Sequence, residues 1–150
     1  MDAPTSIDAE TEELGGLNGI VGFHIRLAHG AVYRHFTETF SDVDLTQKQV
    51  SALWLVGDRP GISQIELGGR LRMDRATTMT IVNRLQERVY LRRERSESDR
   101  RKQALYLTET GTVALGQAKR CIAEHEAWLK SRFTSQETEK LVEMLARIHE

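Results

Sequence analysis

Residues 71–111 combine three structural signals in one short run, and this run constrains the fold more than any other part of the chain. A helical pattern comes first, and two strand-like segments follow at residues 91–95 and 103–107. The residues between these segments are Ser, Glu and Asp with basic neighbours, a composition typical of a turn. The sequence therefore predicts a two-stranded hairpin directly after a helix.

The same run is strongly basic. Residues 70–102 contain eleven Arg and Lys against five Asp and Glu, which gives a formal charge of +6, whereas the whole chain carries −1. The remaining residues must therefore sum to −7. This asymmetry predicts one face that is built to meet a polyanion.

Apolar residues at helical spacing predict helices on both sides of the hairpin. The expected helices cover residues 17–40, 47–56, 64–71, 75–88, 109–133 and 135–148. Three of them begin at a Ser or Thr followed three residues later by Gln or Glu, as in a capping box: Thr46, Ser63 and Thr134. Asp74 and Thr108 are further candidate caps. Met79, Val82 and Leu85 are expected to share one buried face, and Gly68 and Gly69 indicate close backbone packing.

Composition excludes several classes of protein. The one cysteine, Cys121, cannot form an internal disulfide, so we expect a reducing, cytoplasmic location. We find neither a secretion signal nor an apolar run long enough to span a membrane. No phosphate loop or nucleophile elbow is present, so we expect no enzyme and no cofactor. Residues 1–14 are acidic and lack apolar anchors, which predicts a disordered start.

The third and fourth expected helices form a helix-turn-helix pattern, in which the leading end of the second helix enters the major groove. Arg75 suits a bidentate contact with guanine, and Thr77 and Thr78 are short enough to touch base edges or thymine methyl groups. Ser63 and Gln64 begin the preceding helix and suit phosphate contacts, although simple capping explains them equally well.

The order of these elements, with Asp99-Arg100-Arg101 followed by Leu105-Tyr106-Leu107-Thr108 and then Gly111, resembles the MarR family of winged helix-turn-helix transcriptional regulators. The resemblance covers residues 17–150. It implies a mainly α fold with a small two-stranded β wing. Residues 46–109 would form the winged DNA-binding domain, and residues 15–45 and 110–150 a helical dimerisation region.

The resemblance also implies a function. We expect a homodimer that binds a pseudo-palindromic operator in double-stranded DNA as a repressor and is released by a small molecule. Arg101 would reach into the minor groove and Asp99 would orient it. Arg84, Arg95 and Arg100 are expected either to meet phosphates or to form part of a solvated face. Val89 stands where the family usually has Gly, so we expect a differently shaped exit from the recognition helix.

The first expected helix is rich in side chains that suit an aromatic acid or its coenzyme A thioester. Arg26 can pair with a carboxylate, Tyr33 or a histidine can bind a phenolic oxygen, and Trp54 can stack on a ring. The candidate effector residues are Phe23, His24, Arg26, Leu27, His29, Tyr33 and Trp54. For any single one of these residues, a dimer-interface or solvated position is the simpler interpretation.

Two alternatives remain open at this point. A redox switch at Cys121 is one, although a buried structural cysteine without a resolving partner is the simpler interpretation. A winged helix can also serve as a protein-interaction module, but such a module does not require the basic edge. The histidines lack metal-ligand spacing, so we expect no metal.

Overall fold

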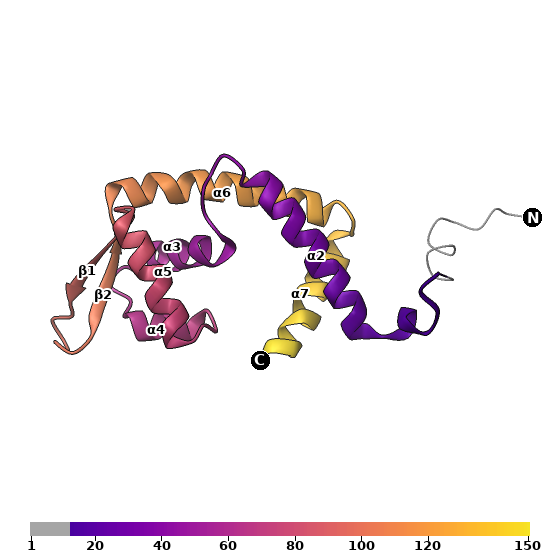
Figure 1. Ribbon diagram of the computed structural model, residues 1–150, viewed down its shortest axis with the longest axis horizontal. Helices are drawn as coiled ribbons and strands as arrows, with labels where there is room; N and C mark the ends of the chain where they lie inside the picture. The colour runs from indigo at the N-terminus through magenta and orange to yellow at the C-terminus, as the bar shows by residue number, and fades with distance from the viewer. Residues whose placement is uncertain (1–12) are drawn as a thin grey trace, which may run out of the picture. The chain divides into compact units, whose positions relative to one another are not determined.

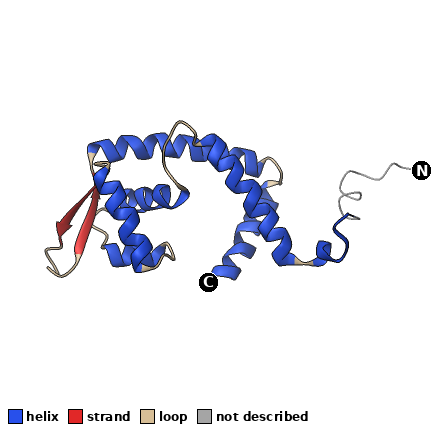
Figure 2. Cartoon of the chain, in the orientation of Figure 1, coloured by secondary structure: helices blue, strands red, loops and turns tan. Residues whose placement is uncertain are grey.

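The computed structural model describes residues 13–150, so most of the acidic start predicted at residues 1–14 lies outside the described residues. The described residues form helices with one antiparallel hairpin (Figures 1 and 2), which confirms the predicted fold class. The elements are the 3₁₀ helix η1 (Gly15–Gly19), helices α2 (Val21–Thr39), α3 (Gln47–Asp58), α4 (Gln64–Arg70) and α5 (Arg75–Glu87), strands β1 (Leu91–Arg95) and β2 (Gln103–Leu107), and helices α6 (Glu109–Lys130) and α7 (Ser135–His149).

These elements divide into two compact units, with the boundary between Glu38 and Thr39. The first unit contains η1 and nearly all of α2, and the second contains the hairpin and the remaining helices. The domain division expected from the sequence, with both ends of the chain forming a dimerisation region, stays a prediction.

Side-chain caps set the starts of the helices in the second unit. Thr46 and Thr134 each form a complete capping box with the residue three positions on, as predicted. Ser63 also caps its helix, but Glu66 pairs with Arg70 and does not complete the box. Each such cap typically contributes about 1 kcal/mol, which explains why these boundaries can be predicted locally.

The first long helix begins later than expected. We predicted a start at residue 17, but residues 15–19 form a 3₁₀ turn and Ile20 is extended before α2 begins at Val21. Three glycines, Gly15, Gly16 and Gly19, explain the difference, because each costs about 1 kcal/mol in a helix relative to Ala.

The core of the second unit is made of leucines from the helices and from the hairpin. Leu53, Leu67, Leu85, Leu91 and Leu105 are fully buried. On α5 the buried face consists of Thr78, Ile81, Val82 and Leu85, so our prediction was right for Val82 and Leu85. It was wrong for Met79, which is 51% exposed because it lies about 100° around the helix axis from the buried Thr78.

The hairpin is fastened to the start of α4. Its strands pair in register from Leu91 with Leu107 to Arg95 with Gln103. The Leu105 amide donates to the Ile62 carbonyl at 2.9 Å, and the Gly61 amide donates to the Leu105 carbonyl at 2.9 Å. The segment before α4 therefore behaves as a short third strand, which fixes the hairpin against the helix-turn-helix.

The exit from α5 keeps the left-handed geometry that a glycine would adopt. Val89 has a φ of +63°, its amide donates to Gln86, and the Tyr90 amide donates to Leu85, which together form a Schellman motif. Our expectation of a differently shaped exit was therefore wrong. Two later residues support the turn: Thr108 donates hydrogen bonds to Val89 and Tyr90, and a Cβ at Gly111 would lie 2.0 Å from the Tyr90 carbonyl oxygen.

Candidate nucleic-acid interface

The leading end of α5 is held by Asp74. Its carboxylate accepts a hydrogen bond from the Thr77 amide at 2.7 Å, and this bond holds the pKa of Asp74 below its usual value. Arg75, the first residue of the helix, is exposed, and Thr77 is half-buried. The cap therefore leaves Arg75 and part of Thr77 accessible from solvent, as a base-reading edge requires.

Thr78 does not belong to that edge. It is only 2% exposed, and its hydroxyl donates to the Asp74 carbonyl at 2.8 Å. A Cβ at Gly68 would lie 2.5 Å from the Thr78 hydroxyl oxygen, so α4 approaches α5 closely here. The close packing predicted for the glycines is thus confirmed at Gly68 and wrong at Gly69, where nothing lies within 4 Å. Our prediction that Thr78 touches bases was wrong, because the side chain joins two helices.

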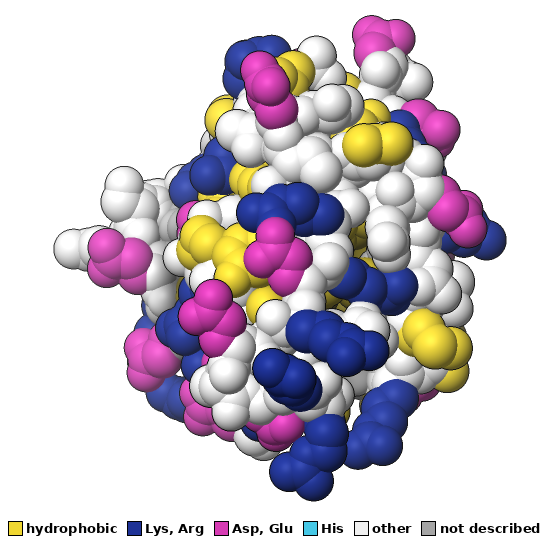
Figure 3. All heavy atoms as spheres, turned by 90° about the vertical axis from the view of Figure 1, so that its left-hand side faces the viewer, with side chains coloured by type: hydrophobic (Ala, Val, Ile, Leu, Met, Phe, Trp, Pro, Cys, Tyr) yellow, Lys and Arg dark blue, Asp and Glu magenta, His cyan; other side chains and the backbone are white. Residues whose placement is uncertain are grey.

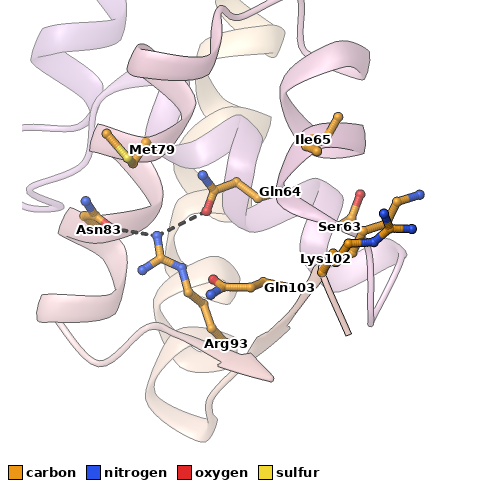
Figure 4. A pocket seen from close by; sticks show the side chains of 9 residues that line it. Ser63, Gln64, Ile65, Met79, Asn83, Arg93, Lys102 and Gln103 are labelled. Carbon is orange, nitrogen blue, oxygen red and sulfur yellow. Dashed lines mark hydrogen bonds between the residues drawn. The ribbon is translucent and has the colours of Figure 1, made fainter. Parts of the chain in front are cut away.

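Arg93 on β1 links three elements of the winged unit (Figure 4). Its Nη1 atom donates to Gln86 at 2.8 Å, and its Nη2 atom donates to Asn83 at 2.6 Å and to Gln64 at 3.1 Å. In the sequence, Arg93 is only one of the eleven Arg and Lys of residues 70–102. The two-residue period of a strand, which places Arg93 on the same face as the buried Leu91, is the signal that separates it from Arg92.

The tip of the hairpin carries the acid–arginine pair that the sequence singled out. The Asp99 carboxylate accepts from the Arg101 amide at 3.0 Å and from its Nε at 3.3 Å. The Arg101 side chain is 93% exposed, whereas the Asp99 side chain is 32% exposed. Asp99 therefore lies against its own turn and holds the backbone amide and the Nε atom of Arg101, whose side chain projects into solvent.

The remaining basic candidates are all at the surface. Arg84, Arg95 and Arg100 are exposed, and Ser63 and Gln64 at the start of α4 are half-buried. Lys and Arg side chains gather over the lower part of the face that carries the hairpin (Figure 3). This face has the charge that a DNA backbone attracts.

Two of the shallow grooves that border α5 bring candidate residues together. One of about 400 Å³ lies between α4, α5 and the hairpin, and is lined by residues that include Gln64, Asn83 and Arg93. The other, of about 430 Å³, lies between α3 and α5 and brings Lys48 and Thr80 beside Thr77 and Arg84. Lys48, Thr80 and Asn83 were absent from our sequence-based candidates, because their grouping depends on how separate helices pack.

Comparison with known proteins identifies this arrangement. The sequence model of the MarR family matches residues 45–102. The solved structure of the transcriptional repressor CouR bound to a 23-mer DNA duplex is 32% identical in sequence, with a TM-score of 0.86 over 91% of this chain and 97% of that one. The chain belongs to the MarR family. It is a winged-helix transcriptional regulator with a DNA-binding fold, and not an enzyme.

Two other proteins resemble this MarR-family chain along most of its length. A Thauera aromatica protein named as a transcriptional regulator for the hcr operon is 27% identical over 147 residues, which cover 97% of this chain and 89% of that protein. BpsR of Bordetella bronchiseptica, whose DNA binding is regulated by 6-hydroxynicotinic acid, has a TM-score of 0.82 at 23% identity over 88% of this chain and 94% of that one. At that identity the likeness to BpsR shows the fold alone.

The effector candidates of this MarR-family chain lie on two helices. Six of the seven, including Arg26, are on α2, and Trp54 is on α3 in the other unit. The Arg26 guanidinium lies 5.2 Å from the centre of the Phe23 ring, and His24 contacts the Asn18 carbonyl at 2.7 Å. The Trp54 ring lies under the Lys119 ammonium at 4.7 Å. Their joint role in an effector pocket stays a prediction.

The surroundings of Cys121 and of the candidate metal ligands favour neither a redox site nor a metal site. Cys121 is half-buried, and desolvation, followed by the nearby Glu124 carboxylate, raises the pKa of its thiol. A raised pKa leaves less of the reactive thiolate at neutral pH, which disfavours the redox alternative. Within residues 13–150, no group of three or more His, Cys, Asp and Glu side chains is placed to hold a metal ion. No helix among the same residues is long and apolar enough to cross a membrane.

Proposed function

We propose that this chain is a dimeric repressor that binds a pseudo-palindromic operator and is released by a small aromatic or phenolic acid or by its coenzyme A thioester. One observation carries the DNA-binding part: Arg75 at the start of α5 and Arg101 at the tip of the hairpin are both exposed on a framework that hydrogen bonds hold together. Such a regulator acts on DNA in the cytoplasm, in agreement with the expected location.

Each part of the surface has its own role in this proposal. Arg75 and Thr77 read base edges in the major groove, and Arg101 enters the minor groove while Asp99 orients it. Ser63, Gln64, Arg84, Arg95 and Arg100 meet the phosphate backbone, where lost counterions add affinity without sequence preference. Thr78 has no role in contacting DNA, because it is buried.

The DNA-binding proposal is tested by fluorescence anisotropy with a labelled duplex from the promoter region beside the chain's own gene. We expect binding that survives an excess of unrelated DNA and weakens steeply as salt rises, because phosphate contacts displace counterions. A scrambled duplex of the same length is the control. Equal affinity for both duplexes, or affinity that does not change with salt, would contradict the proposal.

A second copy of the chain is the partner that the proposal requires. Helix α7 carries apolar side chains that are largely exposed, among them Val142, Leu145 and Ile148. They recur at three- and four-residue spacing, so they form a stripe that suits another helix. Light scattering coupled to size exclusion tests this part, and a monomer at micromolar concentration would contradict it.

The effector part rests on the side-chain chemistry of α2. Arg26 supplies a cation for a carboxylate, and His29 and Tyr33 supply polar atoms for a ring substituent. The BpsR relative, which 6-hydroxynicotinic acid regulates, gives this ligand class a precedent in the same fold. Isothermal titration with benzoic, hydroxybenzoic and hydroxycinnamic acids and a coenzyme A thioester tests it. Absence of heat across the panel would discard the effector class and leave DNA binding untouched.

A further inference from the structure

One arginine beside the groove between α4, α5 and the hairpin donates to three side-chain amides, two of which, Gln64 and Asn83, are drawn in Figure 4. Arg93 donates to Gln64, Asn83 and Gln86, which come from two different helices. Its Nε atom is buried and has no hydrogen-bond partner among the described residues. A buried donor without a partner is costly, so the three hydrogen bonds of Arg93 come with a penalty that stability alone does not explain.

The chemistry of arginine determines how these amides are turned. A guanidinium has only donors, so each amide must present its oxygen to Arg93. The amide nitrogen then faces the opposite way, and Figure 4 shows the Gln64 nitrogen on the side away from the guanidinium. Gln64 and Asn83 both line the groove, whereas Gln86 does not. The NH₂ groups of these two groove residues are therefore turned away from Arg93 and remain hydrogen-bond donors.

We propose that Arg93 is a positioning residue of the DNA interface, and that it fixes Gln64 and Asn83 as donors to acceptor groups on DNA, with Asn83 reading guanine. This inference rests on the proposed DNA-binding function. A free asparagine amide pairs with adenine by donating to N7 and accepting from the N6 amino group. The Asn83 oxygen is turned to Arg93, so only the donor faces DNA, and guanine, with acceptors at both O6 and N7, fits it better.

The sharpest test reverses the polarity of one amide and keeps the arginine in place. In Asn83→Asp, the carboxylate still accepts from Arg93 but presents an acceptor to the groove. We expect unchanged or higher thermal stability, affinity lower by about tenfold, and a preference that moves from guanine to cytosine at one position in each half-site, since acidic side chains accept from the cytosine amino group. Gln86→Glu is the matched control, because it adds the same charge to the same arginine outside the groove.

Both variants are measured with a duplex selected from a random library by the wild-type protein, and with its single-base-pair substitutions. The proposal is overturned if Asn83→Asp and Gln86→Glu lose the same affinity and neither changes base preference. If the wild-type protein enriches no sequence, the proposed function itself fails, which is a distinguishable result.

Arg93→Lys provides an independent test of the positioning role. A lysine keeps the charge, but its ammonium cannot match the planar fork that bonds several oxygens at once. We expect the ratio of affinities for selected and scrambled duplexes to fall about tenfold, while the dependence of affinity on salt is unchanged, because Arg93 replaces no counterion. A ratio equal to that of the wild type, measured well below the unfolding temperature, would overturn the positioning role. If this variant does not fold, the Asn83→Asp and Gln86→Glu pair decides the question.

Discussion

The base and the tip of the hairpin each carry an important arginine, and the two have opposite surroundings. Arg93 at the base donates to three side-chain oxygens from two helices. Arg101 at the tip contacts one carboxylate and is otherwise almost fully exposed. Arg93 thus connects parts of the fold through hydrogen bonds, whereas Arg101 is exposed and accessible to a ligand. A count of positive charges cannot separate the two.

Removing the Arg93 side chain should have the largest effect, a loss of stability. Arg93→Ala deletes three charge-assisted hydrogen bonds, and we expect the free energy of unfolding to fall by about 2–3 kcal/mol. Urea unfolding followed by circular dichroism measures this. Arg95→Ala, two residues along the same strand at an exposed position, is the matched control and should change stability by less than about 0.5 kcal/mol. Equal losses in the two variants would show that the three hydrogen bonds of Arg93 do not stabilise the fold.

The tip arginine should behave in the opposite way. Arg101→Ala should leave the unfolding free energy unchanged and weaken binding to the selected duplex by about 1–3 kcal/mol if the side chain enters the minor groove. Asp99→Asn tests the orienting contact and should have a smaller effect on affinity, because the amide oxygen still accepts a hydrogen bond. Both are measured by anisotropy, and full affinity in Arg101→Ala would exclude the minor-groove role.

The turn that leads into the hairpin base offers a gain in stability. Val89→Gly relieves a β-branched side chain from the left-handed region, which costs about 1–2 kcal/mol, but adds chain entropy to the unfolded state. We expect a net gain of about 0.5–1 kcal/mol in thermal unfolding. Arg72 is also left-handed, with a φ of +55°, but its side chain is unbranched at Cβ. Arg72→Gly should therefore gain less, and an equal or larger gain would contradict this explanation.

The smallest expected effect concerns the cap of α5. The pKa of Asp74 is lowered by its bond from Thr77, so its charge stabilises the fold above the usual carboxyl pKa of about 4. That contribution is lost as the pH falls through the lowered pKa. Asp74→Asn keeps a good cap without the charge. The wild type should be slightly more stable at pH 7, and the difference in urea midpoint should vanish near pH 2; a difference independent of pH would refute this assignment.

The sequence predicted those features that depend on neighbours along the chain. Thr46, Asp74 and Thr134 cap their helices because a hydroxyl or carboxylate meets an amide only three residues away. The hairpin and the pairing of Asp99 with Arg101 are local in the same sense.

Features that depend on packing between elements were missed. Thr78 has the sequence position of a base-reading residue, and only the approach of α4 at Gly68 buries it. Arg93 looked like its basic neighbours until two helices placed three amides around it. Val89 adopts the geometry of glycine because Thr108 and the start of α6 hold the turn from outside.

The two backbone hydrogen bonds between residues 61–62 and Leu105 have a mechanical consequence. They attach the hairpin to the start of α4, and Arg93 adds side-chain hydrogen bonds from β1 to α4 and α5. These hydrogen bonds therefore hold helix α5 and the hairpin at a fixed angle to each other. Under the proposed function, an effector that weakens DNA binding would have to move this whole unit away from its half-site, because bending the hairpin alone would first have to break those hydrogen bonds.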